Sequence, residues 1–135
     1  MIGLFLITHS SYGESLIQCA CHVLNTRPVQ MAQLGVSGQD DPLDLLPLAR
    51  KWLSVVDTGD GVLLLTDVFG ATPSNLAQKL CEPGRIEAVA GLNLPMLLRT
   101  LTYRERETLP GLVNRAVSGG RDGVMAMRTT RDAKT

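Results

Sequence analysis

The stretch Gly61-Val62-Leu63-Leu64-Leu65-Thr66-Asp67 is an apolar run that ends in two polar residues. It follows Asp57-Thr58-Gly59-Asp60, a cluster of residues typical of turns. An unbroken apolar run of this length predicts a strand of a parallel sheet with both faces covered. Strands of that kind belong to α/β folds, so this stretch sets the fold class of the chain.

On both sides of this strand, short apolar runs alternate with longer stretches whose apolar residues recur at helical spacing. The expected strands are 2–7, 29–36, 61–67, 86–91 and 123–127. The expected helices begin near Gly13, Pro42 and Pro73, and two more span 95–101 and 109–117, with Gly119-Gly120 as a stop. This order predicts an α/β fold with a mostly parallel sheet of about five strands. We expect one domain over residues 1–127 and a mobile polar tail over residues 128–135.

The composition excludes some classes of function. The chain has 135 residues, with 13 Lys and Arg against 13 Asp and Glu, so its formal net charge is zero. A nucleic-acid binder that depends on bulk positive charge is therefore not expected, and neither is an acidic disordered chain. The apolar start, residues 1–7, is too short for a membrane span or a signal segment, which predicts a cytoplasmic protein without membrane insertion. The odd cysteine count, Cys19, Cys21 and Cys81, favours reduced, buried or half-buried thiols over a metal site.

The candidate chemistry lies where two expected strands end. His9 follows the first strand, and Asp67 ends the strand 61–67. In open α/β sheets, ligands bind outside the carboxyl ends of the strands, so the two side chains meet if the strands are neighbours. A carboxylate that accepts a hydrogen bond from one imidazole nitrogen leaves the other nitrogen as a nucleophile or base. The alternative is a surface histidine bonded to its own loop and an aspartate that only shapes a turn.

The residues after Asp67 predict an anion site. Gly70 allows a sharp turn, and Thr72 is the expected N-cap of a helix that begins at Pro73 or Ser74. The free N–H groups at a helix N-terminus bind anions of the size of a phosphate. A nucleophilic histidine, an orienting aspartate and an anion hole are therefore expected at one edge of the sheet.

Three motifs carry a resemblance to a known family: Ile7-Thr8-His9-Ser10, the stretch Leu65 to Asn75 (LTDVFGATPSN), and the stretch Ala90 to Leu97 (AGLNLPML). In this order and spacing they resemble the enzyme IIA component of the mannose family of the bacterial phosphotransferase system. The resemblance covers about residues 1–127. It departs from the family at Ala71, where a second glycine is common, and at Phe69, which is Trp in some members.

The resemblance implies a three-layer sandwich whose last strand, Val124 to Met127, is antiparallel and packed or exchanged across a homodimer. It implies that His9 accepts a phosphoryl group from phosphohistidine on the carrier HPr and passes it to a separate enzyme IIB. Asp67 then bonds the same imidazole. The expected phosphate-binding residues are Ser10, Gly70, Ala71 and Thr72. No metal or other cofactor is expected, because the intermediate is a covalent phosphohistidine.

Two other functions remain open. The chain could be a regulatory protein whose His9 phosphorylation state is recognised by partner proteins, without sugar transport. It could also be a small hydrolase that uses His9 and Asp67, although the sequence lacks the G-x-S-x-G nucleophile motif.

Overall fold

The computed structural model describes residues 1–128. Its sheet has four strands in the order β2-β1-β3-β4, and all neighbouring pairs are parallel. The strands are β1 (Gly3–His9), β2 (Met31–Val36), β3 (Val62–Thr66) and β4 (Ile86–Ala90). The helices are α1 (Tyr12–Leu24), α2 (Pro42–Val56), α3 (Thr72–Leu80), α4 (Leu94–Tyr103) and α5 (Leu109–Asp122). The predicted α/β class and three-layer architecture are confirmed.

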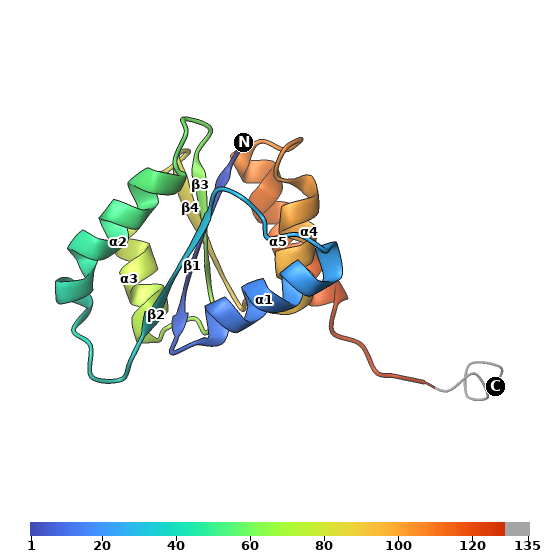
Figure 1. The fold of residues 1–135 in the computed structure, drawn as a ribbon, viewed down its shortest axis with the longest axis horizontal. Helices are drawn as coiled ribbons and strands as arrows, with labels where there is room; N and C mark the ends of the chain where they lie inside the picture. The colour runs from blue at the N-terminus through green and yellow to red at the C-terminus, as the bar shows by residue number, and fades with distance from the viewer. Residues whose placement is uncertain (129–135) are drawn as a thin grey trace.

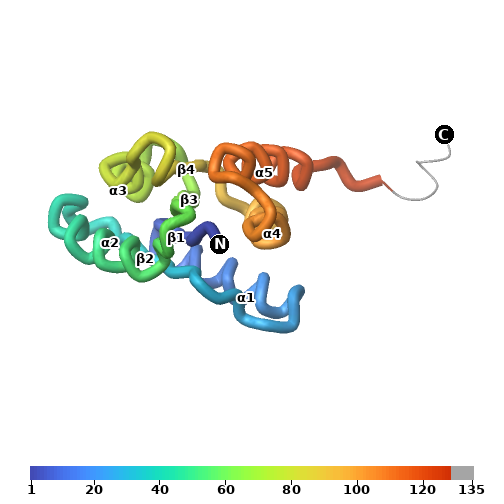
Figure 2. Tube along the Cα trace, turned by 90° about the horizontal axis from the view of Figure 1, so that it is seen from above, coloured from blue at the N-terminus to red at the C-terminus, as the bar shows by residue number. Residues whose placement is uncertain are grey.

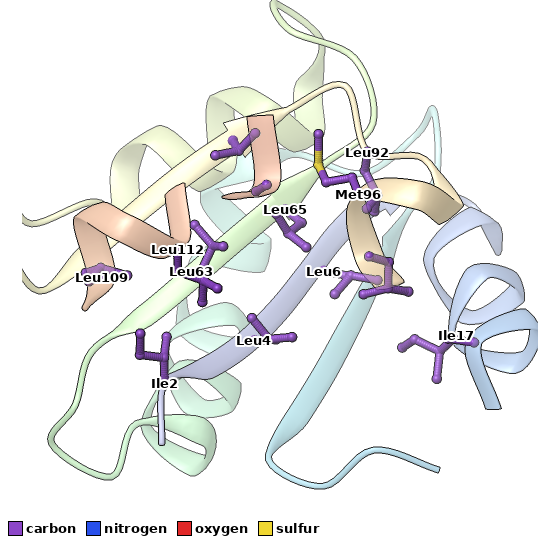
Figure 3. Close-up of a cluster of buried hydrophobic side chains, with 14 residues drawn as sticks. Ile2, Leu4, Leu6, Ile17, Leu63, Leu65, Leu92, Met96, Leu109 and Leu112 are labelled. Carbon is purple, nitrogen blue, oxygen red and sulfur yellow. The ribbon is translucent and has the colours of Figure 1, made fainter. Parts of the chain in front are cut away.

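The helices cover both faces of the sheet. Figures 1 and 2 show α2 and α3 on one face and α1, α4 and α5 on the other. Alternate residues of β1 and β3 point to opposite faces, so each face has its own buried cluster. Leu4 and Leu65 pack toward α1, α4 and α5 (Figure 3), whereas Phe5 and Leu64 pack toward α2 and α3. Burial on both faces is why the sequences of β1 and β3 are continuous apolar runs.

Helix starts follow the capping residues of the sequence. The carboxylate of Asp41 accepts a hydrogen bond from the N–H of Leu43 at the start of α2, at 3.0 Å. The side chain of Asn93 accepts one from the N–H of Met96 at the start of α4, at 2.9 Å. These caps satisfy N–H groups that have no partner within the helix. The helix expected at Pro42 is confirmed.

The stop expected at Gly119-Gly120 is wrong, because α5 continues to Asp122. Both glycines are buried against α4. A Cβ atom at Gly119 would lie 2.9 Å from the Cβ of Arg99, and one at Gly120 would lie 2.8 Å from the Cε of Met96. The two glycines therefore allow α4 and α5 to approach closely rather than ending the helix.

The fifth strand expected at residues 123–127 does not form within the described chain. Residues 124–128 have no regular structure, are exposed, and extend away from the body of the molecule (Figure 1). A strand needs a neighbouring strand for its backbone hydrogen bonds, and this segment leaves α5 without returning to the sheet. Within residues 1–128 the sheet therefore has four strands, where about five were expected. Most of the tail expected at residues 128–135 lies outside the described residues.

Candidate active site

His9 and Asp67 meet at the carboxyl edge of the sheet, the lower edge in Figure 1. His9 is the last residue of β1, and Asp67 directly follows β3, its neighbour. The imidazole Nδ1 of His9 lies 2.8 Å from Oδ2 of Asp67. The backbone N–H of His9 donates to the same oxygen, at 2.9 Å. The structure therefore brings the two predicted residues into direct contact.

The second oxygen of Asp67 is also bonded, because Oδ1 accepts a hydrogen bond from the N–H of Val68 at 3.0 Å. Burial by itself raises the pKa of Asp67, but the hydrogen bonds from His9 and Val68 outweigh it, and the pKa lies below its ordinary value. Asp67 is thus a charged carboxylate at neutral pH. Its side chain is 11% exposed, against 47% for the ring of His9.

The contact with Asp67 determines which imidazole nitrogen can react. A carboxylate only accepts hydrogen bonds, so Nδ1 of His9 carries the proton in this pair. In the neutral ring, Nε2 then holds the free lone pair. Because the ring is half-exposed, Nε2 of His9 is suited to attack an electrophile at the surface of the molecule.

The turn from β1 into α1 is held by contacts with residues of both elements and of β2. The buried hydroxyl of Thr8 accepts a hydrogen bond from the N–H of Gly13 at 2.8 Å. Ser10 has a φ of 50°, and its N–H donates to the carbonyl of Val36 in β2 at 2.9 Å. A Cβ atom at Gly35 would lie 2.1 Å from the carbonyl oxygen of Ser10, so this turn needs a glycine there. Because the N–H of Ser10 already donates this hydrogen bond, the Ser10 hydroxyl is the group of this residue that is suited to contact an anion.

The loop between Asp67 and α3 is fixed by Ser74. The Ser74 hydroxyl accepts a hydrogen bond from the N–H of Gly70 at 2.8 Å and donates to the carbonyl of Ala71 at 2.9 Å. Gly70 has a φ of 86°, a conformation that favours glycine. Ala71 has a φ of −91°, which a residue with a Cβ adopts without strain, so the departure from a second glycine is tolerated.

The N-cap of α3 differs from the prediction. Ala71 is the N-cap and Thr72 is the first helical residue, because extended backbone at residue 71 starts the helix one position earlier. The first N–H groups of an α-helix have no partner within the helix and carry the positive end of its dipole. This N-terminus follows Asp67 by five residues, and Thr72 is half-buried there. The N-terminus of α3, a feature of the kind that favours anions, therefore lies after the loop that begins at Asp67.

Residues of neighbouring elements make contacts that fix the site in place, and sequence reasoning missed these contacts. The N–H of Gly91 donates to the carbonyl of Asp67, and that of Leu92 donates to the carbonyl of Thr66, at 3.0 and 2.9 Å. The hydroxyl of Tyr12 in turn donates to the carbonyl of Leu92 at 2.8 Å. The hydroxyl of Tyr12, close to the first expected strand end, is a local signal for a polar contact, but the sequence does not specify its partner.

Two arginines, Arg104 and Arg99, make contacts apart from His9 and Asp67. Arg104 is buried and donates to three backbone carbonyls, and Arg99 pairs with Asp122. Within residues 1–128, no group of three or more His, Cys, Asp or Glu residues converges into a metal site. The described cysteines are all free; Cys19 is exposed, contrary to expectation, and the other two are half-buried. None of the helices in this part of the chain has the length and apolar character needed to cross a membrane.

The lowered pKa of Asp67 gives a pH prediction. Its charged form stabilises the folded chain above the ordinary pKa of 3.8, and this contribution is lost as the pH falls through the lower folded value. We expect the carboxyl carbon of Asp67, followed by NMR, to titrate with a midpoint below 3.8. His9→Ala should raise this midpoint, because the hydrogen bond from the ring is lost. A wild-type midpoint at or above the ordinary value, or one that the substitution leaves unchanged, would contradict the geometry.

Comparison with known proteins gives the same family for most of the chain. Residues 3–117 match the family model EIIA-man, described as PTS system fructose IIA component. The mannose-specific EIIAB component of the phosphotransferase system of Escherichia coli K12 is 30% identical over 129 residues. That alignment covers 94% of this chain but 40% of the relative, so the chain spans less than half of that protein. The fructose-specific EIIA component of Bacillus subtilis is 46% identical over 54 residues, which cover 39% of this chain and 37% of the relative.

Solved structures share the fold over nearly the full length. The mannose/sorbose-specific IIA subunit of Enterococcus faecalis has a TM-score of 0.83 at 21% identity, covering 95% of this chain and 96% of that one. The EIIA component of Streptococcus agalactiae has a TM-score of 0.82 at 19% identity, covering 93% and 97%. Together with the match to the family model, these findings show that the chain belongs to the mannose family of IIA components of the phosphotransferase system.

Proposed function

We propose that this chain is a phosphoryl-transfer intermediate of the sugar phosphotransferase system that carries the phosphoryl group on Nε2 of His9. The observation that carries the proposal is the contact of Nδ1 with Asp67, at 2.8 Å. It directs the reactive nitrogen outward and keeps a negative charge beside the ring. Family membership supports a role in phosphoryl transfer, and the site supplies a nucleophile for it.

The transfer is a displacement at phosphorus. The lone pair of His9 Nε2 attacks the phosphorus of a phosphohistidine on the donor protein, and a new N–P bond forms. The P–N bond of the donor breaks, and its electron pair returns to the donor's imidazole nitrogen. Nδ1 of His9 keeps its proton, so the phosphorylated ring is formally cationic and is stabilised by the carboxylate of Asp67. The same step in reverse passes the group to an acceptor.

The remaining groups of the site neutralise the negative charge of the phosphoryl oxygens. The N-terminus of α3, the hydroxyl of Thr72 and the hydroxyl of Ser10 are the proposed contacts. Gly70 and Ala71 shape the loop that leads to them, since the N–H of Gly70 is bonded to Ser74. Phosphoryl transfer needs positioning and charge stabilisation more than covalent chemistry from the protein, which these groups provide.

Family membership supports a proposal for the partners. We propose that the donor is phosphorylated HPr and that the acceptor is an enzyme IIB. The relatives are named for mannose and fructose. In the proposed site His9 carries the phosphoryl group, Asp67 bonds its ring and Thr72 contacts the phosphoryl oxygens. The proposal therefore covers the phosphoryl step and leaves the sugar to the acceptor.

Labelling tests the proposed role of His9 and Asp67. With enzyme I, HPr and labelled phosphoenolpyruvate, the wild-type chain should acquire an acid-labile label, and His9→Ala should acquire none. Asp67→Asn should fold and be labelled roughly 10 to 100 times more slowly, because the amide lacks the charge that stabilises the phosphorylated ring. His22→Ala, a substitution of the exposed histidine of α1, is the matched control and should be labelled as fast as wild type. Equal labelling of the His9 variant would exclude this site.

We also propose that the chain forms a homodimer in which residues 124–127 pair as a strand with a second copy. β4 is an edge strand of the four-stranded sheet described. A cavity of about 780 Å³ lies beside it, lined by Ala88, Val89, Val117 and Val124 among others. Val124, Met125 and Met127 are apolar and exposed in the single chain. A partner strand at this edge would bury such side chains and satisfy the backbone of β4.

Light scattering tests the dimer. The full chain should have twice the mass of one copy, and a chain that ends at Gly123 should be monomeric, because it lacks the pairing segment. A chain that ends at Met127 keeps that segment and should remain a dimer. A dimer that persists after truncation at Gly123 would contradict the proposed strand exchange.

A further inference from the structure

The loop beside His9 exposes two apolar side chains. Val68 and Phe69 directly follow Asp67 and are 56% and 76% exposed. They lie at the carboxyl edge of the sheet, next to the nucleophile of the proposed function. A large aromatic side chain left in water gains nothing for the stability of the isolated chain, and it is the type of side chain that anchors protein interfaces.

The backbone that presents Phe69 is held on both sides. On one side, the N–H of Val68 donates to Asp67. On the other, the N–H of Gly70 donates to the Ser74 hydroxyl, which is bonded in turn to Ala71. A partner that binds Phe69 therefore orders little additional backbone, which lowers the entropic cost of association.

Phosphoryl transfer between two proteins requires this loop to be covered. The reacting atoms must approach within about 3–3.5 Å, so a donor with a phosphohistidine must contact the surface around Nε2 of His9. A specific interface buries about 800 Å² on each partner, which extends well beyond one side chain. Phe69, two residues from Asp67, falls within such a footprint.

The charges at this edge indicate the chemistry of the partner. Asp40, Asp41 and Asp44 are exposed at the start of α2, which follows the end of β2 beside His9. Asp41 lines a cavity together with Asn75 in the first turn of α3, the helix that begins after the Phe69 loop, and with Lys79 further along it. Among the ion pairs of residues 1–128, none involves these three carboxylates. An acidic flank of this kind favours a partner with basic side chains.

We propose that Phe69 is the anchor by which this chain docks the protein that donates its phosphoryl group, and that the donor presents an apolar pocket with a basic rim beside its phosphohistidine. This inference rests on the proposed function. Phe69 is not a catalytic residue in it: the side chain binds the donor protein, and Nε2 of His9 performs the chemistry.

Two phosphoryl donors separate docking from chemistry. Phosphorylated HPr must dock before transfer, whereas phosphoramidate is a small donor that reaches His9 without an interface. Labelling rates are measured with each donor for the wild type, for Phe69→Ala and for Phe69→Trp. Val29→Ala is the matched control, because Val29 is also apolar and 70% exposed but lies before β2, at the opposite end of the sheet.

For Phe69→Ala we expect the HPr concentration at half-maximal rate to rise about tenfold, with a correspondingly lower ratio of HPr-dependent to phosphoramidate-dependent labelling. Phe69→Trp should restore the wild-type ratio, and Val29→Ala should keep it. If the wild type is labelled by both donors but Phe69→Ala behaves like Val29→Ala, the docking inference fails and the proposed function stands. Labelling of the wild type by phosphoramidate alone overturns docking of HPr, and labelling by neither donor overturns the proposed function.

Discussion

The parallel pairing of β1 with β3 is the constraint on which the site depends. It brings together two side chains that are 58 residues apart in the sequence, at the edge where both strands end. Because β1 and β3 are central and buried on both faces, the distance between His9 and Asp67 is fixed by the core and not by a flexible loop. Helices α1, α2, α3 and α4 begin at this same edge, since each follows the carboxyl end of a strand. The pairing of β1 with β3 thus places the histidine, its carboxylate and the N-terminus of α3 at one edge of the sheet.

The charge of the site matters more than the charge of the chain. The formal net charge is zero, so the balance alone does not favour either an acidic or a basic partner. By analogy with other phosphorylated side chains, the phosphoryl oxygens on His9 would carry about −1.5 to −2 charges at the exposed edge, and the positive charge of the ring that keeps its Nδ1 proton would offset about one of them. That edge already holds Asp67 and the carboxylates at the start of α2. The proposed cycle therefore changes the electrostatic surface at the place where both partners must bind, which allows donor and acceptor to prefer different states of the chain.

Much of this arrangement follows from local sequence patterns. The strand at 61–67 and the positions of His9 and Asp67 could be predicted because buried parallel strands are apolar runs and the carboxyl ends of parallel strands share an edge. The contacts of Tyr12 with Leu92 and of Ser10 with β2 could not, because they join segments whose spacing only the folded chain determines. Gly119 and Gly120 resemble a helix stop locally, but the close approach of α4 decides their role. Residues 123–127 have the composition of a strand, but within the described part of the chain, residues 1–128, they have no neighbouring strand.

The position of the phosphoryl group on the imidazole ring tests this account most directly. Oδ2 of Asp67 lies 2.8 Å from Nδ1 of His9, so we expect the phosphoryl group to be attached to Nε2. In protein with ¹⁵N-labelled histidine, phosphorylated and studied by NMR, the nitrogen coupled to phosphorus should be Nε2, while Nδ1 should keep its proton. Phosphorus coupled to Nδ1 of His9 would require the contact with Asp67 to break before the reaction, and it would contradict the mechanism.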